Sequence, residues 1–351
     1  QTFAMAGWAA VNTFIAAISL SFIFNILFGW IPYGTSGSTM NMVISIGFIS
    51  IMQAVIAVLG RNIIKYMEWI AGLCLIVLGI LEAVAIFKHF DLNQIMSWKS
   101  LVPVMAVGVM IDGMFGFNWS WTQIGDFSRF AKNKANASIG PWVGINLGQG
   151  WFFVVGSLGA IAVALQTGVF DPNVDPSSIL EKLGLGVISF SIVIFATINT
   201  NATNIYSSSM GILNITKKIS PRKSLTVVAI VQFILCFVPL FYSSFLDFFM
   251  NFLNLTAGLF VPFWSIVLAD YFIIRKGKVG DEIFDEKDGG KYWYKNGFNV
   301  CGIYSLLIGV VCYYGILFFI PNLEAGISAS LPCIVVTSIA YCILAKKGVK
   351  E

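Results

Sequence analysis

The most informative segment of this chain is LVPVMAVGVMIDGMFGFNWSWTQIGDFSRFAKNK, residues 101–134. It begins as an apolar segment with a single acid, Asp112, and reaches a break marked by Gly113, Gly116 and Asn118. Hydrocarbon offers no water to the backbone groups that such a break exposes, so an interrupted membrane helix is tolerated only where it lines a cavity. The stretch therefore predicts a membrane-crossing helix that is broken halfway and borders a binding site.

Composition places the rest of the chain in a lipid bilayer as well. Of the 351 residues, 58% are hydrophobic and 11% are charged, whereas about 25% are charged in ordinary soluble domains. The apolar runs are long and continuous, which indicates helices rather than the alternating strands of a barrel. The sequence thus predicts an all-α integral membrane protein with ten spans, at residues 3–30, 41–60, 66–87, 101–127, 139–166, 184–212, 223–242, 246–274, 298–320 and 327–345.

The basic residues divide unevenly between alternate loops. Of the 21 Lys and Arg residues, 18 fall in one set of loops and in the C-terminal tail, and 3 fall in the other set: Lys88, Lys99 and Lys182. Cytoplasmic loops carry the excess of Lys and Arg. We therefore expect a multi-pass protein of the cell (plasma) membrane with both termini cytoplasmic. The net charge of +4 is a topology signal, so nucleic acid is not an expected partner, and the oligomeric state is not indicated.

The sequence contains few of the residues that catalysis, metal binding or ATP binding require. The single histidine, His89, is expected at a helix end, and the six cysteines lie singly inside apolar runs. This pattern predicts no catalytic triad, metal site or cofactor, and the absence of a Walker-type glycine loop argues against ATP as the driving force. The chain begins at Gln1 rather than Met, and we expect that upstream residues are missing.

Asp112 is the most informative single residue. An acid at the middle of a membrane costs about 2.5–3.5 kcal/mol on insertion scales, so it is expected to face a cavity or a partner on a substrate or ion path. The alternative is a structural hydrogen bond to a neighbouring helix. A second acid, Glu82, lies nearer the outer end of its span, and we assign it a structural role.

An aromatic and an amide share one face of the first span. Trp8 and Asn12 are four residues apart, which places them next to each other on a helix. With Phe117 at the predicted break, they form a set that suits a planar heterocycle: two rings to stack on it and an amide to read its edge. Stacking a base on an aromatic side chain contributes about 1–3 kcal/mol. The alternative is ordinary packing between helices.

The sixth span contains a dense polar run. Thr197, Asn199, Thr200, Asn201, Thr203, Asn204 and residues 206–209 all lie in it. Such groups must be satisfied by each other, by water or by a ligand, and hard oxygen donors suit a small cation. Hydrogen bonding between helices is the alternative.

Taken together, these residues resemble the nucleobase:cation symporter-1 family, which includes cytosine, purine, allantoin and hydantoin permeases. The resemblance covers nearly the whole chain and rests on Gly7-Trp8 with Asn12, Gly116-Phe117, GDFSRFAK (125–132), NTNATNIYSS (199–208) and LADYFIIRKG (268–277). It implies the leucine-transporter-like inverted-repeat fold with twelve helices, of which the first two would be absent here. Within one transmembrane domain, 1–351, it implies the remainder of a first repeat (1–87), a second repeat (101–274) and two peripheral helices (298–345).

The resemblance also implies roles for single residues. Trp8 resembles the family's stacking tryptophan and Asn12 the amide four residues later, while Gly116 and Phe117 resemble the contacts of the broken helix. Either Asn201 or Asn204 resembles the amide that reads the substrate. Asn199 and Thr200 fall at the cation site, where Asn199 departs from the hydroxyl of relatives.

The function expected from these features is secondary active transport. We expect import of a nucleobase or related heterocycle, such as cytosine or hydroxymethylpyrimidine, driven by a Na⁺ or H⁺ gradient, with substrate binding by Trp8, Asn12, Asp112, Gly116, Phe117, Asn201 and Asn204 and cation binding by Asn199 and Thr200. A purine, allantoin or hydantoin permease of the same fold is the alternative, as is a fragment that transports nothing. A channel and a membrane-embedded enzyme are further rivals, and the shortage of catalytic residues argues against the enzyme.

Overall fold

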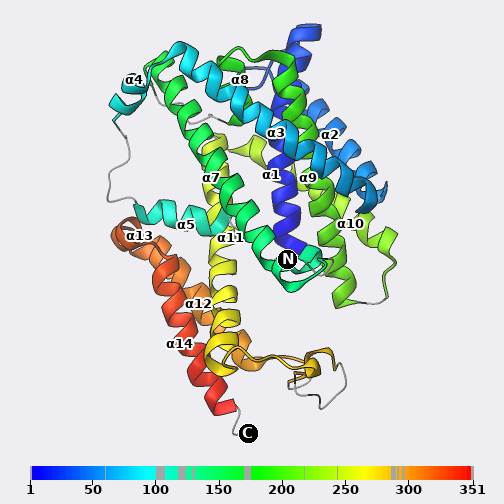
Figure 1. The fold of residues 1–351 in the computed structure, drawn as a ribbon, viewed down its shortest axis with the longest axis vertical. Helices are drawn as coiled ribbons and strands as arrows, with labels where there is room; N and C mark the ends of the chain where they lie inside the picture. The colour runs from blue at the N-terminus through cyan, green and yellow to red at the C-terminus, as the bar shows by residue number, and fades with distance from the viewer. Residues whose placement is uncertain are drawn as a thin grey trace. The chain divides into compact units, whose positions relative to one another are not determined.

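The computed structural model describes residues 2–59, 61–99, 107–117, 124–128, 131–169, 175–216, 218–242, 244–285, 290, 292–294 and 297–348. Its elements are helices (Figure 1). They are α1 (Thr2–Phe28), α2 (Thr39–Leu59), α3 (Arg61–His89), α4 (Leu92–Ser97), α5 (Val107–Phe117), α6 (Ile124–Ser128), α7 (Lys134–Thr167), α8 (Pro176–Lys182), α9 (Gly186–Ile215), α10 (Pro221–Leu235), η3 (Val238–Phe241), α11 (Phe245–Leu268), η4 (Ala269–Ile274), η5 (Asp281–Phe284), α12 (Val300–Phe319), α13 (Pro321–Ile327) and α14 (Ser330–Gly348).

Eight helices within the described residues are long and apolar enough to cross a membrane. They match eight of the ten predicted spans. The consecutive helices α13 and α14 make a ninth candidate, bent by 95° at the break between them. The predicted span 101–127 is described only as the 11-residue α5 and the short α6. The all-α membrane fold is thus confirmed, whereas the count of ten spans is not.

The chain divides into two compact units. Unit 1 contains residues 1–99 and 120–249, and unit 2 contains residues 100–119 and 250–351. The predicted division into 1–87, 101–274 and 298–345 stays a prediction.

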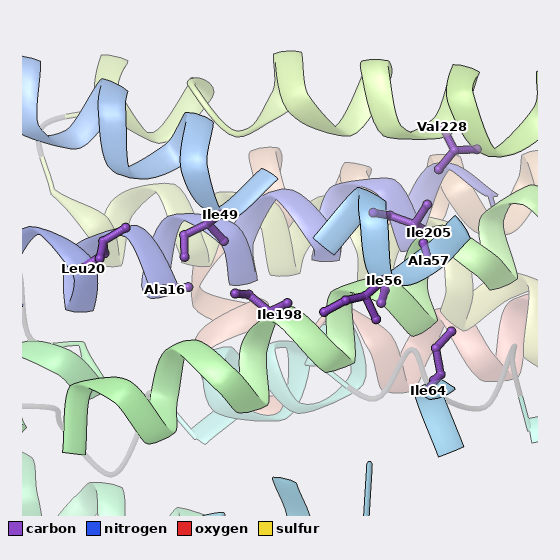
Figure 2. Packing of buried hydrophobic residues seen from close by; sticks show 10 residues of the cluster. Ala16, Leu20, Ile49, Ile56, Ala57, Ile64, Ile198, Ile205 and Val228 are labelled. Carbon is purple, nitrogen blue, oxygen red and sulfur yellow. The ribbon is translucent and has the colours of Figure 1, made fainter. Parts of the chain in front are cut away.

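Unit 1 is organised around α1. This helix is apolar on every side, as expected for a helix that is buried all round, and its alanines and serines allow close approach of its neighbours. It packs mainly along α9 and α2, and α10 lies beside all three. Figure 2 shows the apolar cluster that joins these helices to α3. Its buried members are Ala16, Leu20, Ile49, Ile56, Ala57, Ile64, Ile198, Ala202, Ile205 and Val228.

Unit 2 is organised around one face of α5. Gly108, Asp112 and Gly116 are spaced by four residues, lie on the same side of the helix and are all buried. A Cβ atom on Gly108 would overlap the carbonyl oxygen of Glu324 in α13. A Cβ atom on Gly116 would overlap the carbonyl oxygen of Leu253 in α11. The two glycines therefore allow α5 to touch the backbone of both neighbouring helices.

The motif at residues 268–277 has a structural role at the end of α11. Asp270 accepts hydrogen bonds from Arg275 Nε and from the hydroxyl of Tyr341 in α14, the latter at 2.8 Å. Arg275 also donates to the hydroxyl of Tyr294 at 3.1 Å and lies 4.4 Å from the centre of the Tyr292 ring. These contacts join η4, the following loop and α14.

We predict that Gly116→Ala separates α5 from α11 and lowers stability by about 1–3 kcal/mol, the usual cost of overpacking. Gly113→Ala in the same helix is the matched control, because its Cβ atom would meet Leu253 Cδ1 at an ordinary 3.8 Å. The measurement is the thermal unfolding midpoint of each variant in detergent. Equal midpoints for the two variants would show that the close approach at Gly116 is unimportant.

Candidate substrate and cation site

A buried hydrogen-bond network joins the four central helices of unit 1. Thr13 of α1 lies at its centre, and its hydroxyl accepts from Gln53 Nε2 of α2 at 2.9 Å and from Gln232 Nε2 of α10 at 3.0 Å. Asn201 Nδ2 of α9 donates to the Thr13 hydroxyl at 3.0 Å and to Gln53 Oε1 at 2.8 Å. All four side chains are at most 1% exposed. The network therefore sets the register of α1, α2, α9 and α10 against one another.

The same network determines which way the Asn201 amide points. Its nitrogen lies 3.1 Å from the backbone carbonyl oxygen of Ala9. A carbonyl oxygen only accepts hydrogen bonds, so the amide atom that faces Ala9 has to be the nitrogen. Asn201 Oδ1 then points away from these partners, and it is buried without a hydrogen bond from any described residue. The fold thus presents an unused acceptor at this position.

Asn199 and Thr200 are neighbours in sequence but face different directions. Successive residues of a helix differ by about 100°. Asn199 is fully buried, and neither polar atom of its amide is hydrogen-bonded within the described part of the chain. One turn further on, Thr203 of the same helix donates to Glu68 of α3 at 2.9 Å. Thr200 lines the cavity described next, whereas Asn199 is not among the residues that line it.

That cavity lies in unit 1 and has a volume of about 470 Å³, within the range of small-molecule sites. Five elements line it: α1, α3, α7, α8 and α9. The lining residues are Asn12, Ile15, Leu75, Leu78, Glu82, Phe152, Gly156, Asp175, Pro176, Ile179, Leu180, Val193, Ala196, Thr197 and Thr200. Two predicted site residues, Asn12 and Thr200, are therefore brought together here.

The remaining predicted residues of unit 1 are buried beside this region. Trp8 lies one turn before Asn12 on α1, and its ring meets Phe249 edge to face with centroids 6.0 Å apart. Asn204 is 1% exposed on α9. Neither residue lines the cavity, so the sandwich predicted for Trp8 stays a prediction.

In unit 2, Asp112 binds the start of α14. Its carboxylate accepts hydrogen bonds from the backbone N–H groups of Ala329 and Ser330, both at 2.8 Å, and from the Ser330 hydroxyl. Ser328 precedes this helix with φ 84°, and its hydroxyl accepts from the N–H groups of Ser330 and Leu331. The first N–H groups of a helix have no partner within it, and they attract negative charge. Asp112 therefore makes the structural bond to a neighbouring helix that was the alternative to substrate binding.

Gly116 and Phe117 end the described part of α5. The Gly116 carbonyl oxygen accepts a hydrogen bond from the Thr256 hydroxyl of α11 at 3.1 Å, and Phe117 is half-buried. Of the three residues that mark the predicted break, Gly113 and Gly116 lie inside α5, which continues as a helix through both glycines. The third, Asn118, belongs to residues 118–123, which lie outside the described residues, as do residues 129–130 of the GDFSRFAK motif. The substrate-binding roles of Asp112, Gly116 and Phe117 stay predictions.

Three further polar residues of unit 1, Gln53, Gln232 and Glu82, belong to this region, although the sequence motifs did not indicate them. Gln53 and Gln232 are single amides in apolar spans, and that isolation was the available signal for a buried network. Glu82 was assigned a structural role near the interface, but it is 9% exposed and lines the cavity. The position of Glu82 along the sequence shows how far it lies from the end of α3, but it does not show which other helices pack against that side of α3.

Long apolar helices that enclose buried amides, hydroxyls and a cavity of small-molecule size are the features of a polytopic membrane protein with a ligand site. The family model described as permease for cytosine/purines, uracil, thiamine, allantoin matches residues 1–340. The chain therefore belongs to this family, whose members are permeases rather than enzymes.

Individual relatives agree with this assignment. The chain is 26% identical over 226 residues to the purine-uracil permease NCS1 of Arabidopsis thaliana, covering 61% of this chain and 35% of the relative. It is 26% identical over 327 residues to the allantoin permease of Bacillus subtilis (strain 168), covering 87% of this chain and 64% of the relative. The chain thus spans less than two thirds of the length of either relative.

A solved structure has the same fold. Mhp1, a nucleobase-cation-symport-1 family transporter in a closed conformation with bromovinylhydantoin bound, matches with a TM-score of 0.69 at 19% identity. The match covers 99% of this chain and 75% of Mhp1. It confirms the leucine-transporter-like fold class expected from the sequence.

We predict that Asp112→Ala destabilises the protein by on the order of 1–3 kcal/mol for each buried N–H group of α14 left without an acceptor. Asp112→Asn keeps one acceptor oxygen and should lose less. Asp91→Ala is the control, since Asp91 caps α4 in an exposed position, where a cap contributes about 1 kcal/mol. The check is the unfolding midpoint in detergent, and a change at Asp112 no larger than at Asp91 would contradict the prediction.

Proposed function

We propose that this chain forms the greater part of a secondary active transporter for a planar nitrogen heterocycle of the nucleobase or ureide type. The observation that carries the proposal is the Asn201 amide, whose nitrogen is held by α1 and α2 while its oxygen is buried and unused. A buried acceptor without a donor costs about 1–3 kcal/mol. A ligand N–H group would remove that cost when it binds.

The chemistry of the family's substrates supports this assignment. The family description names cytosine, purines, uracil and allantoin, all of which carry N–H groups on or beside a flat ring. An acceptor in a dry site rejects an analogue that lacks the matching donor much more strongly than one that differs in a methylene group. We therefore propose that Asn201 reads a ring N–H group, and that cytosine and hydroxymethylpyrimidine are among the candidates alongside purines, allantoin and hydantoins.

The remaining predicted roles belong to the same proposal. Trp8 and Asn12 are proposed to contact the ligand from α1, and Asn204 from α9. Asn199 and Thr200 are proposed to bind the coupling cation, Na⁺ or H⁺. The orphaned amide of Asn199 and the position of Thr200 on the cavity support this. The plasma membrane with cytoplasmic termini remains the proposed setting.

Binding of radiolabelled cytosine, uracil, hypoxanthine, allantoin and hydantoin to the purified chain tests the proposal. We predict that the ligand that binds loses affinity at least tenfold, equal to 1.4 kcal/mol, when its ring nitrogens are methylated. For uracil the analogue is 1,3-dimethyluracil, which keeps the ring and both carbonyl groups. This comparison uses the unaltered protein, so it does not depend on how a variant folds.

The matching substitution is Asn201→Ala, which is also expected to weaken binding about tenfold because one hydrogen bond is lost. Asn146→Ala is the control, since Asn146 is exposed on α7 and its side chain donates to the Trp142 carbonyl oxygen of the same helix. Unfolding midpoints measured beside the affinities separate lost binding from lost structure. Undiminished binding of the methylated ligand would reject Asn201 as the reading group, and no binding by any heterocycle would reject the substrate class.

A further inference from the structure

A groove between α2 and α10 of unit 1 has no role in the proposed function. Its volume is about 290 Å³, and both helices belong to segments long and apolar enough to cross a membrane. Ile51 and Val58 of α2 and Ile230 of α10 line the groove, and each is more than half exposed. In a bilayer, the groove would therefore open toward lipid.

Short side chains make this groove hollow. Ala54 and Ala57 of α2 and Ala229 of α10 all line it, between the longer side chains of the same helices. Ala57 and Ile205, both labelled in Figure 2, belong to the buried apolar cluster, and they form the floor of the groove. The groove is thus a depression above a packed interior.

The groove is suited to an apolar occupant. None of the described residues that line it is charged, and its hydroxyl groups come from Ser50 and Thr226. The Thr226 hydroxyl donates to the Arg222 carbonyl oxygen of its own helix at 2.9 Å, and the Ser50 hydroxyl lies 4.0 Å from Cys236 Sγ as its acceptor. The lining positions of α2 run from residue 50 to residue 58, which is about 12 Å along a helix axis. This shape fits part of an acyl chain.

Positive charge gathers at one end of the groove. Arg222 and Lys223 are exposed in the first turn of α10. Arg222 precedes the lining residues Leu225 and Thr226 by three and four positions, so it lies on the same face of the helix. Cations are unfavourable near a helix N-terminus, so the stability of α10 does not account for this pair.

The segments that form the groove contain no acid to neutralise these cations. Residues 205–246 include four basic residues, at positions 217, 218, 222 and 223, and no Asp or Glu, and α2 has no charged residue. Under the proposed topology, this end of the groove faces the cytoplasm. Anionic lipids are enriched in the cytoplasmic leaflet, and basic pockets between membrane helices on that side bind their headgroups.

We propose that the groove between α2 and α10 binds one anionic phospholipid, with an acyl chain along the alanines and the phosphate group at Arg222 and Lys223. Arginine can meet a phosphate through two parallel N–H groups. The site goes beyond the proposed function, since the groove shares no lining residue with the cavity that contains Thr200. It requires neither a heterocycle nor a coupling cation.

Native mass spectrometry of the purified chain in detergent tests the proposal by counting bound lipids during a titration. The probes are dioleoyl phosphatidylglycerol, which is anionic, dioleoyl phosphatidylcholine, which has the same chains and no net charge, and glycerol 3-phosphate, which has no chain. The double variant Arg222→Gln/Lys223→Gln removes the proposed headgroup contacts. Lys134→Gln/Lys278→Gln is its control, because both lysines are exposed and lie outside the groove.

A second pair of variants tests the chain-binding part. Ala229→Phe fills the groove from α10, and Ala54→Phe fills it from α2. Val227→Phe is the matched control, since Val227 is 50% exposed on α10 and does not line the groove. Unfolding midpoints measured without added lipid identify any variant that is not folded, and light scattering records the oligomeric state of each.

The proposal expects one phosphatidylglycerol to bind per chain, at least tenfold more tightly than phosphatidylcholine and without displacement by glycerol 3-phosphate. The double charge variant and the folded groove-filling variants lose at least tenfold in this affinity, whereas both controls keep it. Equal binding of the two lipids, or undiminished phosphatidylglycerol binding in the charge variant, would overturn the site and leave the cations with a role in topology alone. A dimer that is lost in the groove-filling variants while lipid binding is unchanged would instead assign the groove to a second copy of the chain.

Discussion

Hydrogen bonds around the Thr13 hydroxyl hold unit 1 in register. In a membrane, apolar packing favours one arrangement of helices over another only weakly, because lipid tails are as apolar as leucine side chains. Polar side chains favour one arrangement more strongly, since each needs a hydrogen-bond partner in a medium without water. Asn201, Gln53 and Gln232 meet that need at one point on α1, where their amide nitrogens lie 2.9–3.0 Å from the Thr13 hydroxyl oxygen. The orientation of the Asn201 amide, and with it the acceptor proposed to face a ligand, depends on this convergence.

In unit 2 the buried groups that need hydrogen-bond partners are backbone N–H groups. The chain turns sharply between α13 and α14, so α14 begins with N–H groups that are buried and need acceptors. The Asp112 carboxylate and the Ser328 hydroxyl provide them. Glycines one turn to either side of Asp112 let α5 approach closely enough for this contact. A costly acid inside a membrane is here explained by the helix end that it stabilises.

Against this background, polar groups left without partners are informative. Thr13, Gln53 and Gln232 of unit 1 are hydrogen-bonded to neighbouring helices, whereas the Asn201 Oδ1 and Asn199 amide atoms have no partner among the described residues. A neutral acceptor suits a ligand N–H group.

The sequence by itself determined the membrane class, eight of the spans and the family, because apolar length and motifs at 125–132, 199–208 and 268–277 are local properties of the chain. It also restricted Asp112 to a cavity or a helix partner. The partner of Asp112, which is α14, the contact of Gly116 with Leu253 and the packing of Glu82 against α7 became known from the folded structure. The physical reason is that helical spacing determines which residues share a face, whereas the element covering that face depends on contacts between segments far apart in the chain. The presence of Gln53 and Gln232 in apolar spans shows that each amide needs a hydrogen-bond partner. Which residue becomes that partner depends on how the helices pack.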